Sequence, residues 1–299
     1  MRQGRVRKAY NSFFYVDTGA EELVSCKLRG RFKKSRKECC VVPGDCVRIE
    51  LLPDKTGVIE EVLPRETLLR RPAVANVTQV VLTFAAAQPD LHLLLVNRFL
   101  VLAEWSCIPK VRICINKIDL ARENADTLLA DYERIGYSVL HTSAQEGVGV
   151  DALREALAGE VTVFAGPSGV GKSSLLNAAV PGLSLKAGAV SEKIKRGRHT
   201  TRVAELIPCG AGYLVDTPGF SAMELEGLEL AKLAACFPEF RPYLGACRFA
   251  PCSHTHEPDC AVKAAAEKGE ILSERYDAYR TIYQEIEEGQ KLLRRKAYK

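Results

Sequence analysis

Short runs of β-branched and aromatic residues, separated by turns, fill the first part of the chain. Examples are "GRVRKAYNSFFYVDTG", "ELVSCKLRGRF" and "VVPGDCVRIELL", and runs of this kind predict strands. Four or five short strands without a helix predict a small β-barrel, and a five-stranded OB-fold fits the length. We therefore predict an N-terminal barrel domain at residues 1–68.

The pattern changes at about residue 72, where apolar strands begin to alternate with helical spacing. "TQVVLTFAA", "KVRICINKIDL", "YSVLHTSA" and "EVTVFAGPSG" have the composition of buried strands, whereas "LLLVNRFLVLAEWS" and "ADTLLADYERIG" have helical spacing. This alternation predicts a multidomain α/β protein whose central domain, residues 72–225, is a mostly parallel sheet with crossover helices. "LPRETLLRRPAVAN" is expected to be a linker, and "RVAELIPC" with "YLVDTPGF" a hairpin. Residues 226–299 are predicted to be a helical domain with a long charged helix at its end.

The segment "GPSGVGKS", residues 166–173, follows the strand "VTVFA" and precedes the helix "SSLLNAAV". It matches the pattern G-x-x-x-x-G-K-[ST], in which backbone N–H groups and a helix N-terminus bind phosphates. Lys172 is expected to contact the β and γ phosphates, and the Ser173 hydroxyl to ligate Mg²⁺. The predicted nucleotide contacts of this loop are Gly166, Ser168, Gly169, Val170, Gly171, Lys172, Ser173 and Ser174.

A second phosphate contact is predicted at "DTPG", which begins at Asp216 and ends at Gly219. Asp216 can hold Mg²⁺ through water, and the Gly219 N–H can meet the γ phosphate. Between the two motifs lies the basic segment "KIKRGRHTTRV", which we interpret as a switch. Thr201 is favoured as the residue that completes the Mg²⁺ shell, with Thr200 as the alternative.

The segment "NKID", residues 116–119, ends an apolar strand and predicts guanine specificity. The Asp119 carboxylate can accept hydrogen bonds from guanine N1–H and the exocyclic amine, whereas adenine presents an acceptor at that position. Asn116 can brace the loops and Lys117 can lie along the base. In "HTSAQEG", Ser143 and Ala144 follow, and a backbone N–H there can meet guanine O6.

The guanine motif precedes the phosphate loop, although such a loop normally comes late in a nucleotide-binding domain. A circular permutation explains this order, because a site depends on geometry and domain termini often lie close together. The permutation also makes "DTPGF" lead directly into the C-terminal region. We therefore hypothesise that the nucleotide state is transmitted to that region along the chain.

The segment "CRFAPCSHTHEPDC" contains cysteines and histidines at metal-ligand spacing. Cys247, Cys252, His254 and Cys260 form a C-x4-C-x-H-x5-C pattern, which predicts a closed tetrahedral site for one structural Zn²⁺. His256 is the competing ligand, and free thiols in a loop are the alternative.

Charge and cysteine content bear on partners and location. The net charge is +5, but residues 1–40 hold eleven Lys or Arg against four Asp or Glu, so the barrel is expected to bind a polyanion. A solvated loop is the alternative, and the aromatic residues Phe13, Phe14, Tyr15 and Phe32 are predicted to lie in the core rather than on a nucleic-acid platform. No apolar run reaches the roughly 18 residues of a membrane span. Eleven cysteines without an export signal indicate a reducing, cytoplasmic location and no membrane partner.

In their shared order, these motifs resemble the ribosome small-subunit-dependent GTPase A (RsgA) family of circularly permuted bacterial GTPases. The resemblance covers essentially the whole chain, through "VVPGDCVRI", "INKIDL", "GPSGVGKSSLLN", "GRHTTR", "DTPGF" and "CRFAPCSH". It implies an OB-fold, a permuted GTPase domain and a C-terminal zinc domain. It also implies binding to the small (30S) ribosomal subunit and its rRNA late in assembly, alongside other assembly factors, with GTP hydrolysis to GDP stimulated by that subunit. We expect a monomer.

One catalytic group is missing from the motifs. Ras-like enzymes place a water-orienting glutamine after Asp-x-x-Gly, whereas Phe220 stands there in this chain. The catalytic candidates are Lys172, Thr201 and His199, and His199 is the one expected to position the water. An equal alternative is that His199 only contacts rRNA or solvent. A P-loop ATPase or kinase with a nucleic-acid-binding barrel, and a GTP-binding RNA scaffold without significant turnover, are the alternative functions.

Overall fold

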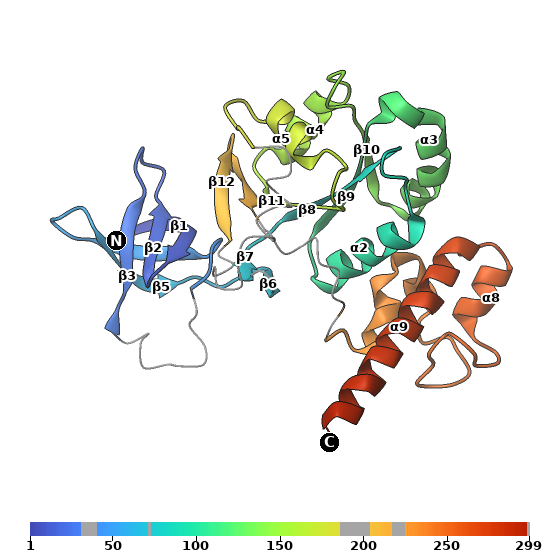
Figure 1. Ribbon diagram of the computed structural model, residues 1–299. Helices are drawn as coiled ribbons and strands as arrows, with labels where there is room; N and C mark the ends of the chain where they lie inside the picture. Colours follow the sequence, from blue (N-terminus) through green and yellow to red (C-terminus); the bar gives the residue numbers. More distant parts are fainter. Residues whose placement is uncertain (31–40, 71–72, 186–203, 217–224, 226, 298–299) are drawn as a thin grey trace.

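The computed structural model describes residues 1–30, 41–70, 73–185, 204–216, 225 and 227–297 (Figure 1). Three parts follow one another along the chain: a β-barrel, a central sheet covered by helices, and a C-terminal helical region. The long last helix extends away from the body of the molecule (Figure 1).

The barrel is closed and five-stranded, as predicted. Its strands are β1 (Arg2–Tyr10), β2 (Phe13–Asp17), β3 (Val24–Leu28), β4 (Cys46–Leu51) and β5 (Gly57–Val62). They pair in the order β1-β2-β3-β5-β4, and β4 pairs back onto β1. Alternate side chains such as Val6, Val16 and Ile59 are fully buried inside it.

The aromatic residues of β2 divide between the two faces of this strand. Phe14 is buried in the barrel core, whereas Phe13 is 38% exposed. The ammonium of Lys27 lies 5.0 Å from the centre of the Phe13 ring. The prediction that these aromatics belong to the core is therefore right for Phe14 and wrong for Phe13, because successive side chains of a strand point to opposite faces.

The central sheet places its strands in the order β10-β9-β8-β11-β13-β12. Their bounds are β8 (Gln79–Ala85), β9 (Lys110–Asn116), β10 (Ser138–His141), β11 (Val161–Ala165), β12 (Glu205–Cys209) and β13 (Gly212–Asp216). All neighbours are parallel except the β12–β13 hairpin. Counted from β11, this order is 2-3-1-4-5-6, the order of an unpermuted Ras-like domain. The sheet is therefore conventional in space, and its chain order is permuted.

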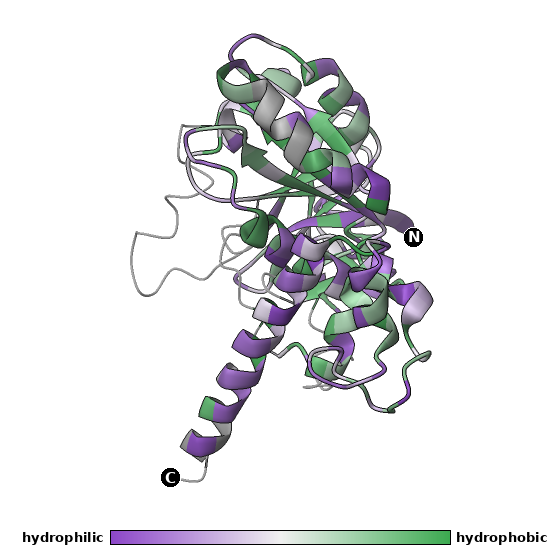
Figure 2. Cartoon of the chain, turned by 90° about the vertical axis from the view of Figure 1, so that its right-hand side faces the viewer, coloured by the Kyte–Doolittle hydropathy of each residue, from purple (hydrophilic) through white to green (hydrophobic). Residues whose placement is uncertain are grey.

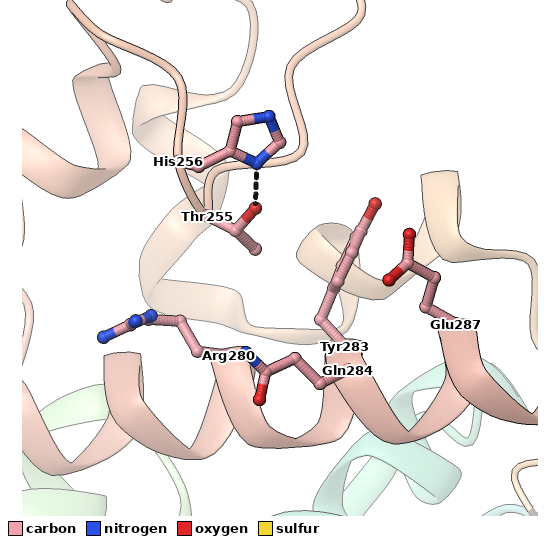
Figure 3. Close-up of a pocket in the computed structure, with 6 residues that line it drawn as sticks. All are labelled: Thr255, His256, Arg280, Tyr283, Gln284 and Glu287. Carbon is pink, nitrogen blue, oxygen red and sulfur yellow. Dashed lines mark hydrogen bonds between the residues drawn. The ribbon is translucent and has the colours of Figure 1, made fainter.

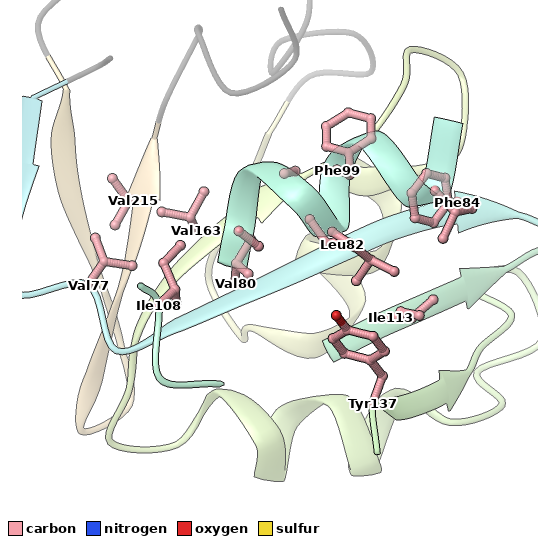
Figure 4. Close-up of a cluster of buried hydrophobic side chains, with 14 of the residues drawn as sticks. Val77, Val80, Leu82, Phe84, Phe99, Ile108, Ile113, Tyr137, Val163 and Val215 are labelled. Carbon is pink, nitrogen blue, oxygen red and sulfur yellow. The ribbon is translucent and has the colours of Figure 1, made fainter. Parts of the chain in front are cut away.

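Helices cover both faces of this sheet. They are α2 (Leu93–Trp105), α3 (Ile118–Ile135), α4 (Val150–Leu157) and α5 (Lys172–Ala179). Val80, Leu82 and Phe84 of β8 pack with α2 and α3 in one core cluster (Figure 4), whereas Val81 packs with α4 and α5 in another. The continuous apolar run of β8 is thus explained by burial on both faces.

The segment predicted to be a linker contains structure of its own. β6 (Leu68–Arg70) and β7 (Ala73–Ala75) form a small antiparallel sheet. Leu69 and Val74 of this segment, and Val77 directly after it, are buried in the main core cluster. The expectation of a plain linker is wrong, because these apolar side chains pack against the central domain.

The C-terminal region packs against α2. Its elements are α7 (Leu230–Leu233), the 3₁₀ helices η1 (Ala234–Cys236) and η2 (Pro238–Tyr243), α8 (Ala261–Glu267) and α9 (Ser273–Ala297). Val101 of α2 joins their core cluster, while its neighbour Leu100 joins the cluster under the sheet. Helix α2 is apolar nearly all round because it is buried on both sides.

The far end of α9 is mostly hydrophilic, as Figure 2 shows. Among the described residues, no helix combines the length and the apolar character that a membrane span requires.

Candidate active site

Three predicted motifs meet at the side chain of Asn116, which ends β9 and is 2% exposed. Its Nδ2 donates a hydrogen bond of 2.8 Å to the Val170 carbonyl of the phosphate loop. Its Oδ1 accepts one of 3.1 Å from the Ala144 N–H. One buried amide therefore joins the "NKID", "GPSGVGKS" and Ser-Ala segments.

Two glycines of the phosphate loop are required by close approach. Gly171 has φ +91°, and a Cβ there would lie 2.3 Å from Asn116 Nδ2. Gly166 has φ +140°, and a Cβ there would lie 1.9 Å from the Thr83 carbonyl oxygen of β8. Any other residue would displace the loop from β8 and β9.

The guanine-binding candidates are held in a fixed arrangement. The Ser143 hydroxyl donates a hydrogen bond of 2.6 Å to Asp119 Oδ1, which orients the carboxylate. Lys117 adopts a left-handed conformation with φ 61°, and its ammonium donates to the Gly169 carbonyl at 2.8 Å. The same ammonium also donates to the Gln88 carbonyl. The lysine stem is thus fixed beside the phosphate loop.

Lys172 begins α5, and its side chain folds back onto the phosphate loop. The residue is 5% exposed, and its ammonium donates to the carbonyls of Gly166 at 2.8 Å and Pro167 at 2.6 Å. Burial lowers the pKa of the Lys172 ammonium to about 8. An incoming phosphate would therefore meet a charge that is poorly solvated and can gain from a strong anionic partner.

The other candidates of the loop differ in exposure. Ser173 is 8% exposed, and its hydroxyl has no hydrogen bond to another described residue, so it can serve as an oxygen ligand for Mg²⁺. Val170 is buried, whereas Ser168, Gly169 and Ser174 lie exposed at the rim.

Asp216 is the last residue of β13, whose neighbour β11 is parallel and leads into the phosphate loop. Because carboxyl ends of parallel strands meet at one edge of a sheet, its backbone lies at the same edge as Gly166. The remaining predicted residues of this site, namely His199, Thr200, Thr201, Gly219 and Phe220, lie outside the described residues.

The four predicted metal ligands come together. The ligand atoms of Cys247, Cys252, His254 and Cys260 all lie within 4.8 Å of one another. Cys247 Sγ is 3.8 Å from Cys260 Sγ, and His254 Nδ1 is 3.4 Å from each of these two sulfurs. Tetrahedral bonds of about 2.3 Å place neighbouring ligand atoms about 3.8 Å apart. The group can therefore hold one metal ion.

The metal loop, residues 252–257, is fixed by groups outside the ligand set. The Glu257 carboxylate accepts from the Ser253 N–H at 2.6 Å. The hydroxyls of Tyr276 and Tyr279 on α9 donate to the carbonyls of His254 at 2.9 Å and Ser253 at 2.6 Å. Burial lowers the pKa of His254, which favours the neutral imidazole that a metal needs.

His256, the competing ligand, lies outside the metal group. Its Nδ1 forms a hydrogen bond of 3.0 Å with the Thr255 hydroxyl, and the residue is exposed.

Comparison with known proteins gives a consistent result. The family description "RsgA GTPase" matches residues 62–226, and "RsgA N-terminal domain" matches residues 3–59. Relatives named small ribosomal subunit biogenesis GTPase RsgA include one from Moorella thermoacetica, 47% identical over 286 residues, covering 95% of this chain and 97% of that protein. Another, from Alkaliphilus metalliredigens, is 43% identical over 295 residues, covering 97% and 100%. The chain belongs to the RsgA family.

Two solved structures agree with this RsgA assignment. The crystal structure of YjeQ from Thermotoga maritima has a TM-score of 0.82 at 37% identity, covering 95% of this chain and 98% of that one. The structure of YloQ, described as a circularly permuted GTPase, has a TM-score of 0.80 at 36% identity and covers 96% of each chain. The permuted GTPase architecture of the RsgA family is therefore present here.

Sequence reasoning missed two groups in this RsgA-family chain. The first is the Gln88 carbonyl, in the loop after β8, which accepts a hydrogen bond from Lys117. Because it is a backbone group, no sequence motif could indicate it. The second is Glu257, which fixes the metal loop. Its position in the sequence between two predicted metal ligands could have indicated this role.

Proposed function

We propose that this chain is a GTP hydrolase that binds the small (30S) ribosomal subunit and acts in its late maturation. The naming of its relatives and the shared motifs support this proposal. Its turnover of GTP to GDP and phosphate is stimulated by the subunit. We place the protein in the cytoplasm as a monomer, with rRNA as its main contact and other assembly factors as further partners.

The observation that supports a guanine nucleotide best is the junction at Asn116. Its amide holds the phosphate loop and the Ala144 segment at once, and the Asp119 carboxylate is oriented by Ser143 beside it. A carboxylate in that place favours guanine, because guanine offers two N–H donors. The other nucleotide contacts are then Lys117, Ser174, Asp216, Gly219 and the phosphate loop from Gly166 to Ser173.

In the reaction, a water oxygen attacks the γ phosphorus, and the bond from that phosphorus to the β–γ bridging oxygen breaks, which leaves GDP and phosphate. Lys172 would stabilise the negative charge on the phosphates. Ser173 and Thr201 would hold Mg²⁺, which neutralises charge on the β and γ oxygens. His199 is assigned, from sequence alone, the task of positioning the water.

The metal centre is proposed to hold one structural Zn²⁺ through Cys247, Cys252, His254 and Cys260. All four tetrahedral positions are taken by protein atoms, which leaves none for a substrate. The site would stabilise the C-terminal region rather than take part in hydrolysis.

The barrel is proposed to bind rRNA. Phe13 and Tyr10 are exposed on either side of the β1–β2 turn, and Lys27 lies over the Phe13 ring. Exposed rings beside cations bind unstacked bases and backbone phosphates. The domain division of the sequence, 1–68, 72–225 and 226–299, assigns this role to the first domain.

Phosphate release, measured with and without purified small subunits, tests the function. We expect slow release with GTP alone, faster release with subunits, and none with ATP. Release with ATP would favour the P-loop ATPase alternative, and no release in any mixture would favour the GTP-binding scaffold.

Asp119→Asn tests the base assignment separately. The variant should bind xanthine nucleotides better than guanine nucleotides, because the amide offers a donor to the xanthine 2-oxo group. Asp54→Asn, which changes an exposed carboxylate in the β4–β5 turn of the barrel, is the control and should retain guanine preference.

A further inference from the structure

A cavity of about 270 Å³ lies between the metal loop and one side of α9. Its lining residues are Thr255, His256, Arg280, Tyr283, Gln284 and Glu287. Figure 3 shows the Tyr283 ring rising from α9 toward the loop of Thr255 and His256, with Glu287 on one side of it and Arg280 on the other. Neither the metal centre nor the nucleotide site uses these side chains.

The lining offers the groups that bind an unstacked nucleobase. Tyr283 supplies an aromatic ring, Gln284 supplies an amide with both donors and an acceptor, and Glu287 supplies a carboxylate acceptor. The Gln284 amide is exposed and has no hydrogen bond to another described residue. Proteins recognise single-stranded RNA by stacking bases on such rings and bonding their edges to such polar groups.

The walls of the cavity are fixed before any ligand arrives. Glu257 holds the metal loop through the Ser253 N–H, and Tyr276 and Tyr279 bind its carbonyls from α9. A preformed cavity reduces the ordering that binding requires. Its volume lies just below the roughly 300 Å³ at which pockets for larger ligands begin, which suits one base.

The charges around the cavity balance. Arg280 lies 3.7 Å from the Asp277 carboxylate, and Glu287 lies 2.9 Å from the Lys291 ammonium. General attraction to phosphates is therefore weak here, in contrast to the basic barrel. Contacts to a base edge specify a site, whereas phosphate contacts add affinity that depends on salt.

We propose that this cavity receives one unstacked nucleotide of the small-subunit RNA, stacked on Tyr283 with its base edge on Gln284. The inference rests on the proposed function, because it takes the small subunit as the partner. It assigns a base-specific contact to the C-terminal region, next to the metal loop.

The test uses the full metal-loaded chain, saturated with a non-hydrolysable GTP analogue and titrated onto purified small subunits. Tyr283→Leu removes the ring, and Gln284→Ala removes the amide without touching the core. We expect Tyr283→Leu to bind at least about five-fold more weakly, since stacking on one aromatic ring is worth that much or more. Gln284→Ala should bind about two- to ten-fold more weakly, which is the net contribution of one hydrogen bond. The salt dependence of binding should stay unchanged. Thr281→Ala, whose hydroxyl bonds only within α9, is the control and should bind like the wild type.

Chemical probing of the subunit RNA identifies the occupant. At saturating protein, the wild type should protect the pairing edge of one single-stranded base, and Tyr283→Leu should leave that base reactive. Unchanged affinity and protection in both variants would refute the proposal. Weaker binding without any change in base reactivity would assign the cavity to a protein side chain and also refute it. If the wild type fails to bind subunits at all, the proposed function fails, and the inference falls with it.

Discussion

The central domain has two junctions, and they differ in how they are buried. One contact of the barrel with it is the pairing of β1 with β12, at Lys8 and Glu205. That ion pair spans 3.1 Å and both side chains are about 40% exposed. The C-terminal region instead meets α2 through a shared apolar core and through Arg275, whose side chain is 2% exposed.

Arg275 is fully paired in its buried position. Its Nε and Nη2 donate to the Glu239 carboxylate at 2.6 and 3.0 Å, and its Nη1 donates to Asn97 Oδ1 of α2 at 2.6 Å. Tyr132 of α3 donates to the same Asn97 oxygen at 3.0 Å. The guanidinium also lies 4.5 Å from the centre of the Phe237 ring. The C-terminal region is thus fixed to both helices on one face of the sheet.

The two parts also differ in the element of the central domain to which each is attached. The C-terminal region is bound to α3, the helix that begins in the guanine motif at Ile118. The barrel contacts β12, the strand that follows the predicted switch segment, through the half-exposed Lys8–Glu205 pair and through Arg7, whose Nε donates to the Leu206 carbonyl at 3.0 Å. It is also bound to the β6–β7 segment, where the buried Asn76 amide donates to the Gly44 carbonyl at 3.0 Å. Because β12 directly follows the predicted switch, we expect nucleotide state to affect the contacts of the barrel with β12 more than the contacts of the C-terminal region with α2.

Among the changes that test this comparison, removal of the metal should affect the C-terminal region most. Structural zinc in small fingers supplies roughly 10 to 16 kcal/mol of binding free energy, so a chelator should unfold the C-terminal region. Trp105, the one tryptophan of the chain, packs against the C-terminal core and should shift its fluorescence to longer wavelength. Guanine nucleotide binding by the chelated protein should persist. An unchanged Trp105 spectrum after complete metal loss would contradict the assigned role of the metal.

Truncation of Arg275 should have the next largest effect. Arg275→Ala leaves the Glu239 carboxylate buried without its partner, which costs about 3 to 5 kcal/mol. Urea unfolding followed by Trp105 fluorescence should show this loss. Arg280→Ala, on the exposed side of the same helix, should change the free energy of unfolding by less than about 1 kcal/mol. Equal losses of unfolding free energy in the two variants would show that the buried network of Arg275 stabilises the protein no more than an exposed side chain does.

The sequence predicted the parts of this molecule that depend on local pattern. The barrel, the permuted strand order and the four-ligand metal group follow from strand periodicity, motif order and ligand spacing, and the structure confirms them. The junctions could not be predicted in the same way. Asn97 and Arg275 lie 178 positions apart, and nothing in either local sequence indicates the other.

The active site shows the same limit. Asn116 was expected to brace loops because its motif is local, and its amide does join two of them. The Gln88 carbonyl, which binds Lys117, belongs to the backbone of another loop. Its contribution depends on the turn after β8, which side-chain identity does not specify.

The pH dependence of nucleotide binding tests the role of Lys172 in the phosphate loop. At pH 7 the Lys172 ammonium is mostly protonated in the free protein, because burial lowers its pKa only to about 8. A bound phosphate raises that pKa, so binding above pH 8 takes up a proton and weakens with rising pH. The expected loss is at most about ten-fold per pH unit. Binding of GDP measured between pH 7 and 9 checks this, and Arg275→Ala should show the same dependence.

Lys172→Met is the control for this dependence. It should bind GDP more weakly at every pH and lose the decline above pH 8. A decline that persists in Lys172→Met would assign the proton to another group.

The smallest effect is expected at the barrel junction. Lys8→Ala should lower the free energy of unfolding by no more than about 1 kcal/mol, because both partners are solvated and the pair is screened by salt. A double-mutant cycle with Glu205→Gln isolates the pair, and its coupling energy should fall further in high salt. Trp105 fluorescence should stay unchanged, since Lys8 lies at the opposite junction. A coupling energy of about 3 kcal/mol, as large as the loss of unfolding free energy expected for Arg275→Ala, would contradict the description of the Lys8–Glu205 pair as solvated and weak.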